Sequence, residues 1–355
     1  MRRGPSRSVP PWRHRVRGAA LSADIAALVL GCDGTVLSAA ERDFFRDVNP
    51  LGFILFRRNV EDPAQVRALV RDLRDAVGRH APILIDQEGG RVARLRGPHW
   101  PDLPAARAIG DLPDAEMATQ AAWLHGRLLA ATLADLGIDV DCAPVADVPV
   151  PGAHDVIGDR AFAMDPDRVA RLAGSQAAGL LAGGVLPIVK HIPGHGRAFA
   201  DSHKELPVVG AGRADLEVWD FAPFKALAHL PAAMVAHVVY TDIDPALPAS
   251  VSPTVITDIV RGHIGFDGLL FSDDLSMQAL SGTLGQRTAA VLAAGCDVAL
   301  HCNGRMEEMR DVVAHARALD AEGLRRWSAA AGLVAQAPET DINAMRAEFD
   351  RLLAG

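Results

Sequence analysis

The alternation of short apolar runs with longer helical patterns constrains the fold of this 355-residue chain more than any other feature. Eight runs are nearly continuously apolar, which is typical of strands buried on both faces of a parallel sheet. The segments between them show helical spacing and tend to stop at glycine. The apolar runs span residues 25–30, 52–56, 83–86, 138–142, 185–189, 233–238, 269–272 and 297–301, and the expected helices span 63–78, 115–136, 167–182, 214–230, 253–263 and 288–294, with two or three more after residue 306.

Eight repeats of strand and helix predict an α/β fold, a single-domain TIM (β/α)8 barrel over residues 21–355. A doubly wound open sheet is the alternative, and it is less favoured because no G-x-G-x-x-G follows the first apolar run. Residues 1–20 contain six arginines, three prolines and no acidic residue. This composition predicts a disordered basic N-terminal extension, with a targeting or tethering arm as the alternative.

Charge and cysteine content restrict the partners and the compartment. The net charge of −8 argues against a nucleic acid or an anionic membrane as partner of the main body. No apolar stretch approaches the roughly 20 residues that span a bilayer. The four cysteines form no C-x-x-C pair, and no signal-peptide core is recognisable, so we expect reduced thiols in a cytoplasmic protein. The oligomeric state is not encoded in any pattern, and a monomer is favoured.

Polar residues follow the apolar runs at the ends where barrel enzymes place their chemistry. Because successive strand residues point to opposite faces, only one of Asp273 and Asp274 is expected to enter a pocket. The other is expected to cap a helix that continues through Leu275. The rim residues predicted in this way are Asp86 to Arg91, Lys190, His191, His237, Asp242, Asp244, Asp273, Asp274 and 301–303.

The segment from Lys190 to His203 is the richest in titratable groups. Asp201 and His203 lie two residues apart, close enough for a carboxylate to orient an imidazole as a general acid/base near neutral pH. Gly194 and Gly196 predict a loop that moves to deliver His203. A metal-dependent hydrolase using His191, His195, Asp201 and His203 as ligands is an alternative. It is less favoured because a sequence-local cluster on a glycine-rich loop makes a poor rigid cage, so no metal or other cofactor is expected.

Three motifs resemble the signatures of family 3 glycoside hydrolases. They are Asp86-Gln87-Glu88-Gly89-Gly90-Arg91-Val92, Lys190-His191-Ile192-Pro193-Gly194-His195-Gly196 with Asp201-Ser202-His203, and Phe271-Ser272-Asp273-Asp274-Leu275-Ser276-Met277. The similarity covers about residues 25–335 and is greatest to the single-domain bacterial β-N-acetylglucosaminidases of peptidoglycan recycling. The histidine-containing second motif is the most specific, because most of the wider family lacks it.

The resemblance implies a retaining exo-β-N-acetylglucosaminidase that acts through a covalent glycosyl-enzyme intermediate. Asp273 would be the nucleophile, His203 the general acid and then base, and Asp201 the group that holds His203. The implied substrate is a small carbohydrate, a (1,6-anhydro)muropeptide. The implied sugar-binding residues are Asp86, Arg94, Arg160, Lys190 and His191.

Two further alternatives to hydrolysis stay open. A phosphorylase is possible because a neutral imidazole base repels phosphate less than a carboxylate does. A non-catalytic sugar-binding protein on a barrel scaffold is the other, although a binder needs neither Asp273 nor His203.

Overall fold

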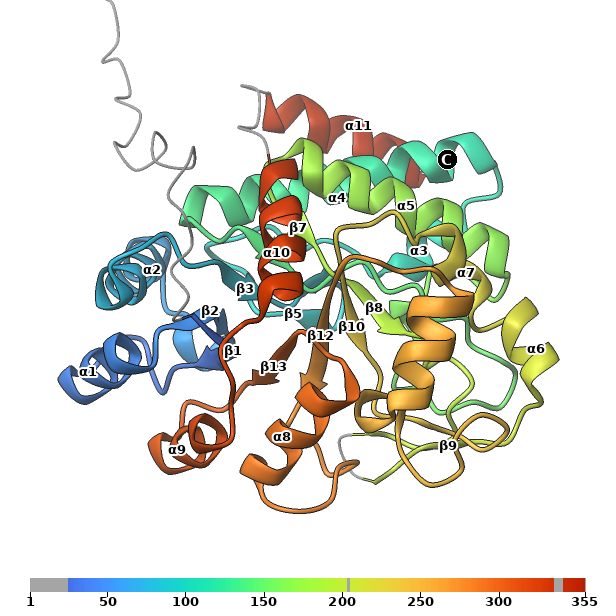
Figure 1. Ribbon diagram of the computed structural model, residues 1–355. Helices are drawn as coiled ribbons and strands as arrows, with labels where there is room; N and C mark the ends of the chain where they lie inside the picture. The colour runs from blue at the N-terminus through green and yellow to red at the C-terminus, as the bar shows by residue number, and fades with distance from the viewer. Residues whose placement is uncertain (1–24, 203–204, 335–340, 355) are drawn as a thin grey trace, which may run out of the picture.

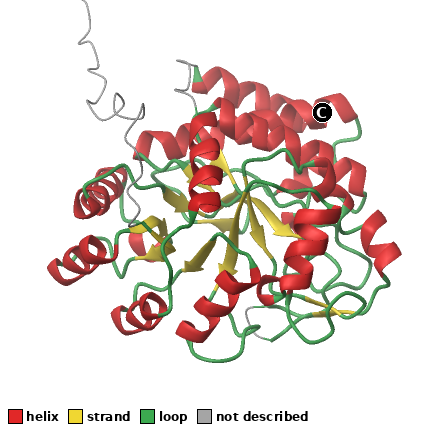
Figure 2. Cartoon of the chain, in the orientation of Figure 1, coloured by secondary structure: helices red, strands yellow, loops and turns green. Residues whose placement is uncertain are grey.

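A parallel barrel forms the centre of the molecule, surrounded by helices (Figures 1 and 2). The computed structural model describes residues 25–202, 205–334 and 341–354. The strand order in the sheet is β7-β6-β3-β2-β1-β13-β12-β10-β8, and all neighbours pair in parallel. Its strands are β1 (Ala26–Gly31), β2 (Pro50–Leu55), β3 (Ile83–Ile85), β6 (Val140–Asp141), β7 (Leu186–Pro187), β8 (Val189–Ile192), β10 (Ala232–Val235), β12 (Leu269–Asp274) and β13 (Val298–His301).

The barrel closes through β7 and β8, which are consecutive parts of the fifth predicted strand. β7 pairs with β6, and β8 pairs with β10 on the other side. Ile188, between them, donates its backbone N–H to Asp141 O at 2.9 Å. The fifth strand is thus hydrogen-bonded to both neighbours, so the nine segments form eight barrel strands and the predicted fold is confirmed.

The helices begin and end where the sequence carries capping residues. Asp62 caps α2 with Pro63 in its first turn, and Gly78 ends it at φ 64°, a left-handed conformation that glycine adopts without strain. The α-helices are α1 (Ala39–Val48), α2 (Pro63–Val77), α3 (Ala106–Gly110), α4 (Ala115–Leu136), α5 (Pro166–Ala182), α6 (Arg213–Val218), α7 (Ala222–Ala226), α8 (Leu284–Ala294), α9 (Met306–Ala314), α10 (Ala321–Leu333) and α11 (Ile342–Ala354). A π-helix covers Val255–His263, and short strands β4 (Gln87–Gly89), β5 (Val92–Ala93), β9 (Val208–Val209) and β11 (Val239–Tyr240) lie in the loops.

Two helix predictions are wrong. The expected helix over residues 214–230 is broken into α6 and α7, because Pro223 has no N–H to donate and is accommodated only in the first turn of a new helix. The chain after Asp274 forms turns through residue 282. The Asp274 carboxylate accepts hydrogen bonds from the N–H and hydroxyl of Ser276, which closes a turn that competes with helix formation.

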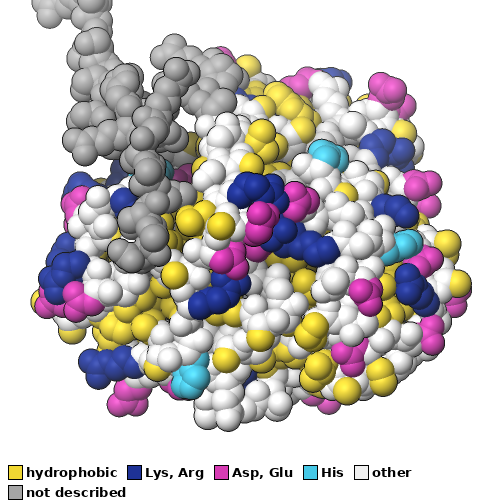
Figure 3. All heavy atoms as spheres, viewed as in Figure 1, with side chains coloured by type: hydrophobic (Ala, Val, Ile, Leu, Met, Phe, Trp, Pro, Cys, Tyr) yellow, Lys and Arg dark blue, Asp and Glu magenta, His cyan; other side chains and the backbone are white. Residues whose placement is uncertain are grey.

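Helix α10 lies across the amino-terminal end of the barrel. Arg326 pairs with Asp267 and Asp297, which precede β12 and β13. Figure 3 shows acidic and basic side chains intermixed over the face that α10 occupies in Figure 1. The carboxyl ends of the strands lie at the opposite end of the barrel.

All four cysteines lie within the described residues, and each is a buried free thiol. Within the described ranges, no helix combines the length and apolar character needed to cross a membrane. The predicted extension, residues 1–20, lies outside the described residues.

Candidate active site

A polar cavity of about 230 Å³ opens among the carboxyl ends of the barrel strands. Its lining includes six of the predicted site residues, which come from four different strand ends and loops. Those six are Asp86, Arg94, Arg160, Lys190, His191 and Asp273. The topology therefore brings together residues that are up to 187 positions apart in the sequence, at the rim where barrel enzymes carry out their reactions.

Five side chains of alternating charge run along one wall of the cavity. Arg94 Nη2 lies 2.9 Å from Asp86 Oδ2, and Asp86 Oδ1 lies 2.8 Å from Lys190 Nζ. Lys190 Nζ also lies 2.7 Å from Glu88 Oε1. Arg160 binds the Glu88 carboxylate through Nε and Nη2, at 2.9 and 2.8 Å, as a bidentate ion pair. Three cations and two carboxylates share this wall, so every charge has a partner and the set carries one excess positive charge.

Burial and pairing act in opposite directions on the pKa values of this wall. Burial alone would raise the pKa of Glu88, but Arg160 and Lys190 outweigh it and hold the pKa at about 2. Lys190 and Arg94 likewise overcome burial at Asp86 and keep its pKa well below the usual range. Burial would lower the pKa of Lys190, but Asp86 and Glu88 raise it above its ordinary value. At neutral pH the wall is therefore fully ionised.

Asp147 organises the two histidines of the second motif. It is fully buried, and its Oδ2 lies 2.7 Å from His191 Nδ1 while its Oδ1 accepts the N–H of His195 at 2.7 Å. Since a carboxylate only accepts hydrogen bonds, the Nδ1 of His191 carries a proton. Burial lowers the pKa of His195 to about 4, so this second imidazole is neutral at pH 7.

Asp273 and Asp274 both line the cavity, so the expectation that only one enters is wrong. The pairing of β12 with β13 shifts register between Phe271 and Asp274, which breaks the strict alternation of faces. The two carboxylates still differ in their contacts. Asp274 Oδ1 accepts the N–H of Cys302 at 3.1 Å as well as that of Ser276, while Asp273 Oδ1 accepts the N–H of Asp274 at 2.8 Å.

The loop that follows β8 approaches the same cavity. His195 Nε2 lies 3.1 Å from the Ser202 hydroxyl, and both residues are buried and line the cavity. Ser202 O accepts the N–H of Ala279, in the loop after β12. Asp201 is half-buried beside them. His203 lies outside the described residues, so the structure describes only Asp201 of the predicted acid/base pair.

The sequence analysis placed Glu88 at the rim but assigned it no role, and it missed Asp147. A role for Glu88 beside Asp86 was detectable, because residues two apart in an extended segment share a face. Asp147 carried no local signal. Several predicted rim residues do not line the cavity, and four of them have partners elsewhere. His237 binds Ser250 and Asp274 O, Asp242 accepts Arg213 N–H, Asp244 binds Ser252, and His301 lies beside Glu308.

A metal set is not apparent in the part of the chain that the structure describes, where no three His, Cys, Asp or Glu side chains gather as ligands. Of the four ligands considered for a metal site, His191 is engaged by Asp147 and His195 by Ser202, while His203 is not among the described residues.

A closed (β/α)8 barrel with a small cavity at its carboxyl rim, one wall of which is fully ionised, is typical of an enzyme for a polar substrate. The family model of the glycosyl hydrolase family 3 N-terminal domain matches residues 30–325. The chain therefore belongs to glycosyl hydrolase family 3, and the predicted family is confirmed.

Named relatives agree with this assignment. A β-hexosaminidase of Pseudomonas aeruginosa is 43% identical over 283 residues, which are 79% of this chain and 83% of the relative. The crystal structure of NagZ from Neisseria gonorrhoeae in complex with N-trifluoroacetyl-D-glucosamine is 33% identical with a TM-score of 0.81, covering 93% of this chain and 97% of that one. A family 3 β-N-acetylglucosaminidase from Paenibacillus sp. is 30% identical with a TM-score of 0.82, covering 94% and 68%.

Proposed function

We propose that this enzyme removes terminal non-reducing N-acetylglucosamine from β-glycosides, with retention of configuration. The enzyme class, a glycoside hydrolase of the β-N-acetylhexosaminidase kind, is confirmed by the relatives named β-hexosaminidase. The observation that carries the finer proposal is the placement of Asp273 in the same cavity as the charged wall of Asp86, Glu88 and Lys190. A nucleophilic carboxylate facing a row of fixed donors and acceptors suits a sugar, whose hydroxyl groups need both.

Cavity size supports action on a chain end. The volume of about 230 Å³ lies below the roughly 300–1,000 Å³ typical of sites for drug-sized ligands. A cavity of this size suits one sugar unit rather than an oligosaccharide. Asp86, Arg94, Arg160, Lys190 and His191 would bind the hydroxyl and acetamido groups of that unit, and the leaving group would extend out of the cavity.

Two displacements would account for retention. In the first, an Asp273 carboxylate oxygen attacks the anomeric carbon while the His203 imidazolium gives its proton to the departing glycosidic oxygen. In the second, neutral His203 takes a proton from water, the water oxygen attacks the same carbon, and the Asp273 carboxylate departs. Asp201 would favour the imidazolium through its charge and would orient the ring.

The natural substrate proposed is a (1,6-anhydro)muropeptide, and the proposed compartment is the cytoplasm. The resemblance to peptidoglycan-recycling enzymes supports the substrate. Four buried free thiols support a reducing compartment.

The decisive experiment traps the intermediate. A fluorinated N-acetyl-β-glucosaminide that reacts slowly should label the peptide carrying Asp273, as seen by mass spectrometry, and Asp273→Asn should abolish the label. Asp274→Asn is the matched control, because its carboxylate is engaged by Ser276 and Cys302 and the adduct should still form. Label on another peptide, or turnover without any label, would contradict the proposal.

Substrate and acceptor are tested separately. An aryl N-acetyl-β-glucosaminide should be cleaved much faster than the plain β-glucoside, and free N-acetylglucosamine should appear without phosphate. A sugar phosphate formed only when phosphate is present would assign a phosphorylase instead.

A further inference from the structure

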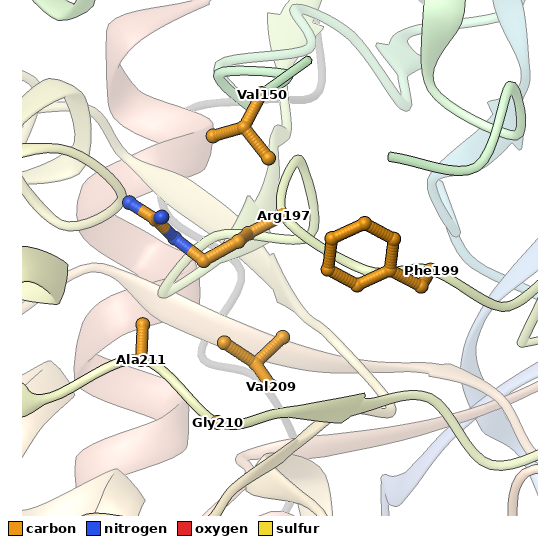
Figure 4. Close-up of a pocket in the computed structure, with 6 residues that line it drawn as sticks. All are labelled: Val150, Arg197, Phe199, Val209, Gly210 and Ala211. Carbon is orange, nitrogen blue, oxygen red and sulfur yellow. The ribbon is translucent and has the colours of Figure 1, made fainter. Parts of the chain in front are cut away.

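The loop after β8 contributes to two cavities. His195 and Ser202 line the active-site cavity, whereas Arg197 and Phe199 line a second cavity of about 280 Å³. Figure 4 shows the Arg197 side chain crossing this second cavity between Val150 on one side and Val209 and Ala211 on the other. Residues 195–202 therefore contribute side chains to both cavities, and this segment includes Asp201 of the proposed acid/base pair.

Backbone contacts fix the first residues of this loop. The Tyr240 hydroxyl donates to Gly194 O at 2.5 Å, and the His195 N–H donates to Asp147. Gly196 lies so close to the backbone of Val148 that a Cβ there would come within 2.2 Å of Val148 O. The loop therefore leaves the barrel along a defined path as far as residue 196.

Beyond Gly196, an ion pair holds the loop to the segment between α6 and α7. Arg197 Nε donates to Asp220 Oδ2 at 2.9 Å. The Asp220 side chain is 1% exposed and that of Arg197 is 22% exposed. Arg197 is four residues before Asp201. The ion pair therefore restrains the backbone four residues before the proposed acid/base pair.

Asp220 is poorly satisfied for a buried carboxylate. Its buried Oδ1 has no hydrogen-bond partner among the described residues. Burial raises its pKa to about 6, because Arg197 only partly compensates for the loss of water. A buried charge with an unpaired oxygen adds little to stability and often lowers it. The ion pair is therefore poorly explained as a stabilising contact, although its geometry restrains the loop.

We infer that Asp220 is a positioning residue for proton transfer: by holding Arg197 it places the loop that carries Asp201 and His203, without itself touching the substrate. The inference rests on the proposed roles of these two residues. It predicts an effect that depends on the leaving group, because a poor leaving group needs a proton from the acid and an activated aryl group does not.

The test compares wild type with Asp220→Asn in the full-length enzyme. The measurement is kcat/KM, which reports the glycosylation step, for N-acetyl-β-glucosaminides whose leaving groups span a wide pKa range. With the poorest leaving groups kcat/KM should fall about 10- to 100-fold, as expected for a misplaced catalytic group. With the most activated aryl group it should stay within about twofold, and the unfolding midpoint should be unchanged or higher. Equal losses on all substrates, or no loss, would overturn the inference.

Variants at the other end of the pair and a matched control complete the test. Arg197→Ala should reproduce the leaving-group dependence, and Arg197→Lys should recover part of the rate because it keeps the charge. Asp297→Asn removes a buried carboxylate held by Arg261 and Arg326 at 2.9 and 2.8 Å, away from the loop. It should lower stability and affect all substrates equally.

A parallel arm separates this inference from the proposed function. If His203→Ala shows no leaving-group dependence, the acid role of His203 is wrong. If His203→Ala shows it and Asp220→Asn does not, the acid role stands and the positioning role of Asp220 is wrong.

Discussion

Neutralising Glu88 tests whether the charged wall of the cavity is as strongly coupled as its geometry implies. Its carboxylate is 7% exposed and contacts Arg160 through both oxygens and Lys190 through one. Glu88→Gln keeps the shape of the side chain and removes the charge. Arg160 and Lys190 would then be buried with one carboxylate, Asp86, in place of two.

The magnitude follows from the pKa of Glu88, which these cations hold at about 2 against a usual value of 4.5. A shift of one pKa unit corresponds to about 1.4 kcal/mol, so folding favours the charged form of Glu88 over the neutral form by about 3 kcal/mol. The general cost of removing one partner of a buried pair, about 3–5 kcal/mol, is of the same order. We therefore expect Glu88→Gln to lower the free energy of unfolding by about 3 kcal/mol at pH 7.

The pH dependence of this stabilisation follows from the direction of the pKa shift of Glu88. Because the pKa is lower in the folded state, the stabilisation is complete above pH 4.5 and is lost as the pH falls toward 2. Urea unfolding of wild type and Glu88→Gln should show a constant difference from pH 7 to 5, and a shrinking one below pH 4.5.

Glu217→Gln is the control for burial. Glu217 contacts Arg213 at 2.7 Å, as short as the Glu88 contacts, but the Glu217 side chain is 30% exposed and that of Arg213 is 50% exposed. Its unfolding midpoint should stay close to that of wild type, since solvent screens such pairs. A loss below about 1 kcal/mol for Glu88→Gln, or one no greater than for Glu217→Gln, would refute the reasoning from burial. Adding Arg160→Gln to Glu88→Gln should cost less than the sum of the two single changes.

Three other perturbations have defined outcomes. His195→Gln should flatten the dependence of stability on pH. The pKa of His195 is about 4 in the folded protein and near 6.5 in the unfolded chain, so through this group wild type should lose about 1 kcal/mol of unfolding free energy between pH 7 and 5.5. Urea unfolding at both pH values measures this loss. Gly110→Ala should unfold at clearly lower temperature, because its Cβ would lie 1.6 Å from Phe162 O; a midpoint equal to wild type would contradict this close approach. Asp147→Asn should lower kcat/KM about tenfold or more by releasing the His191 ring, and an unchanged value would mean that this hydrogen bond does not orient it.

Local patterns were sufficient to predict the eight barrel strands and most of the helices around them. The helix Ala115–Leu136 was predicted at its observed bounds, because the residues that end it, Asp114 and Gly137, directly flank it in the sequence. The eight strands were recognised because burial on both faces leaves them almost wholly apolar. The helix predicted over residues 214–230 failed because its apolar spacing runs through Pro223, where the chain has to begin a new helix.

The site was predictable only where one segment carries the signal. Lys190 and Asp86 stand out at the ends of apolar runs, and they are in direct contact. That Asp147 orients His191 from 44 positions away depends on how two loops meet, which no local pattern encodes. The prediction of His237 as a rim residue is wrong for a related reason. It follows a strand, as a rim residue would, but its ring is hydrogen-bonded to Ser250 and to the backbone of Asp274.

The two chemical tasks proposed for this pocket belong to chain segments of different kinds. Lys190 and His191 belong to β8, paired with β10 inside the barrel wall, whereas Asp201 is carried on an excursion that begins after Pro193. Under the proposed roles, sugar recognition is built into the barrel scaffold and proton delivery belongs to a loop attached to it. Replacing residues 196–202 offers a route to enzymes with altered tolerance for the departing alcohol that keep their preference for the sugar, which makes this loop the natural unit for redesign.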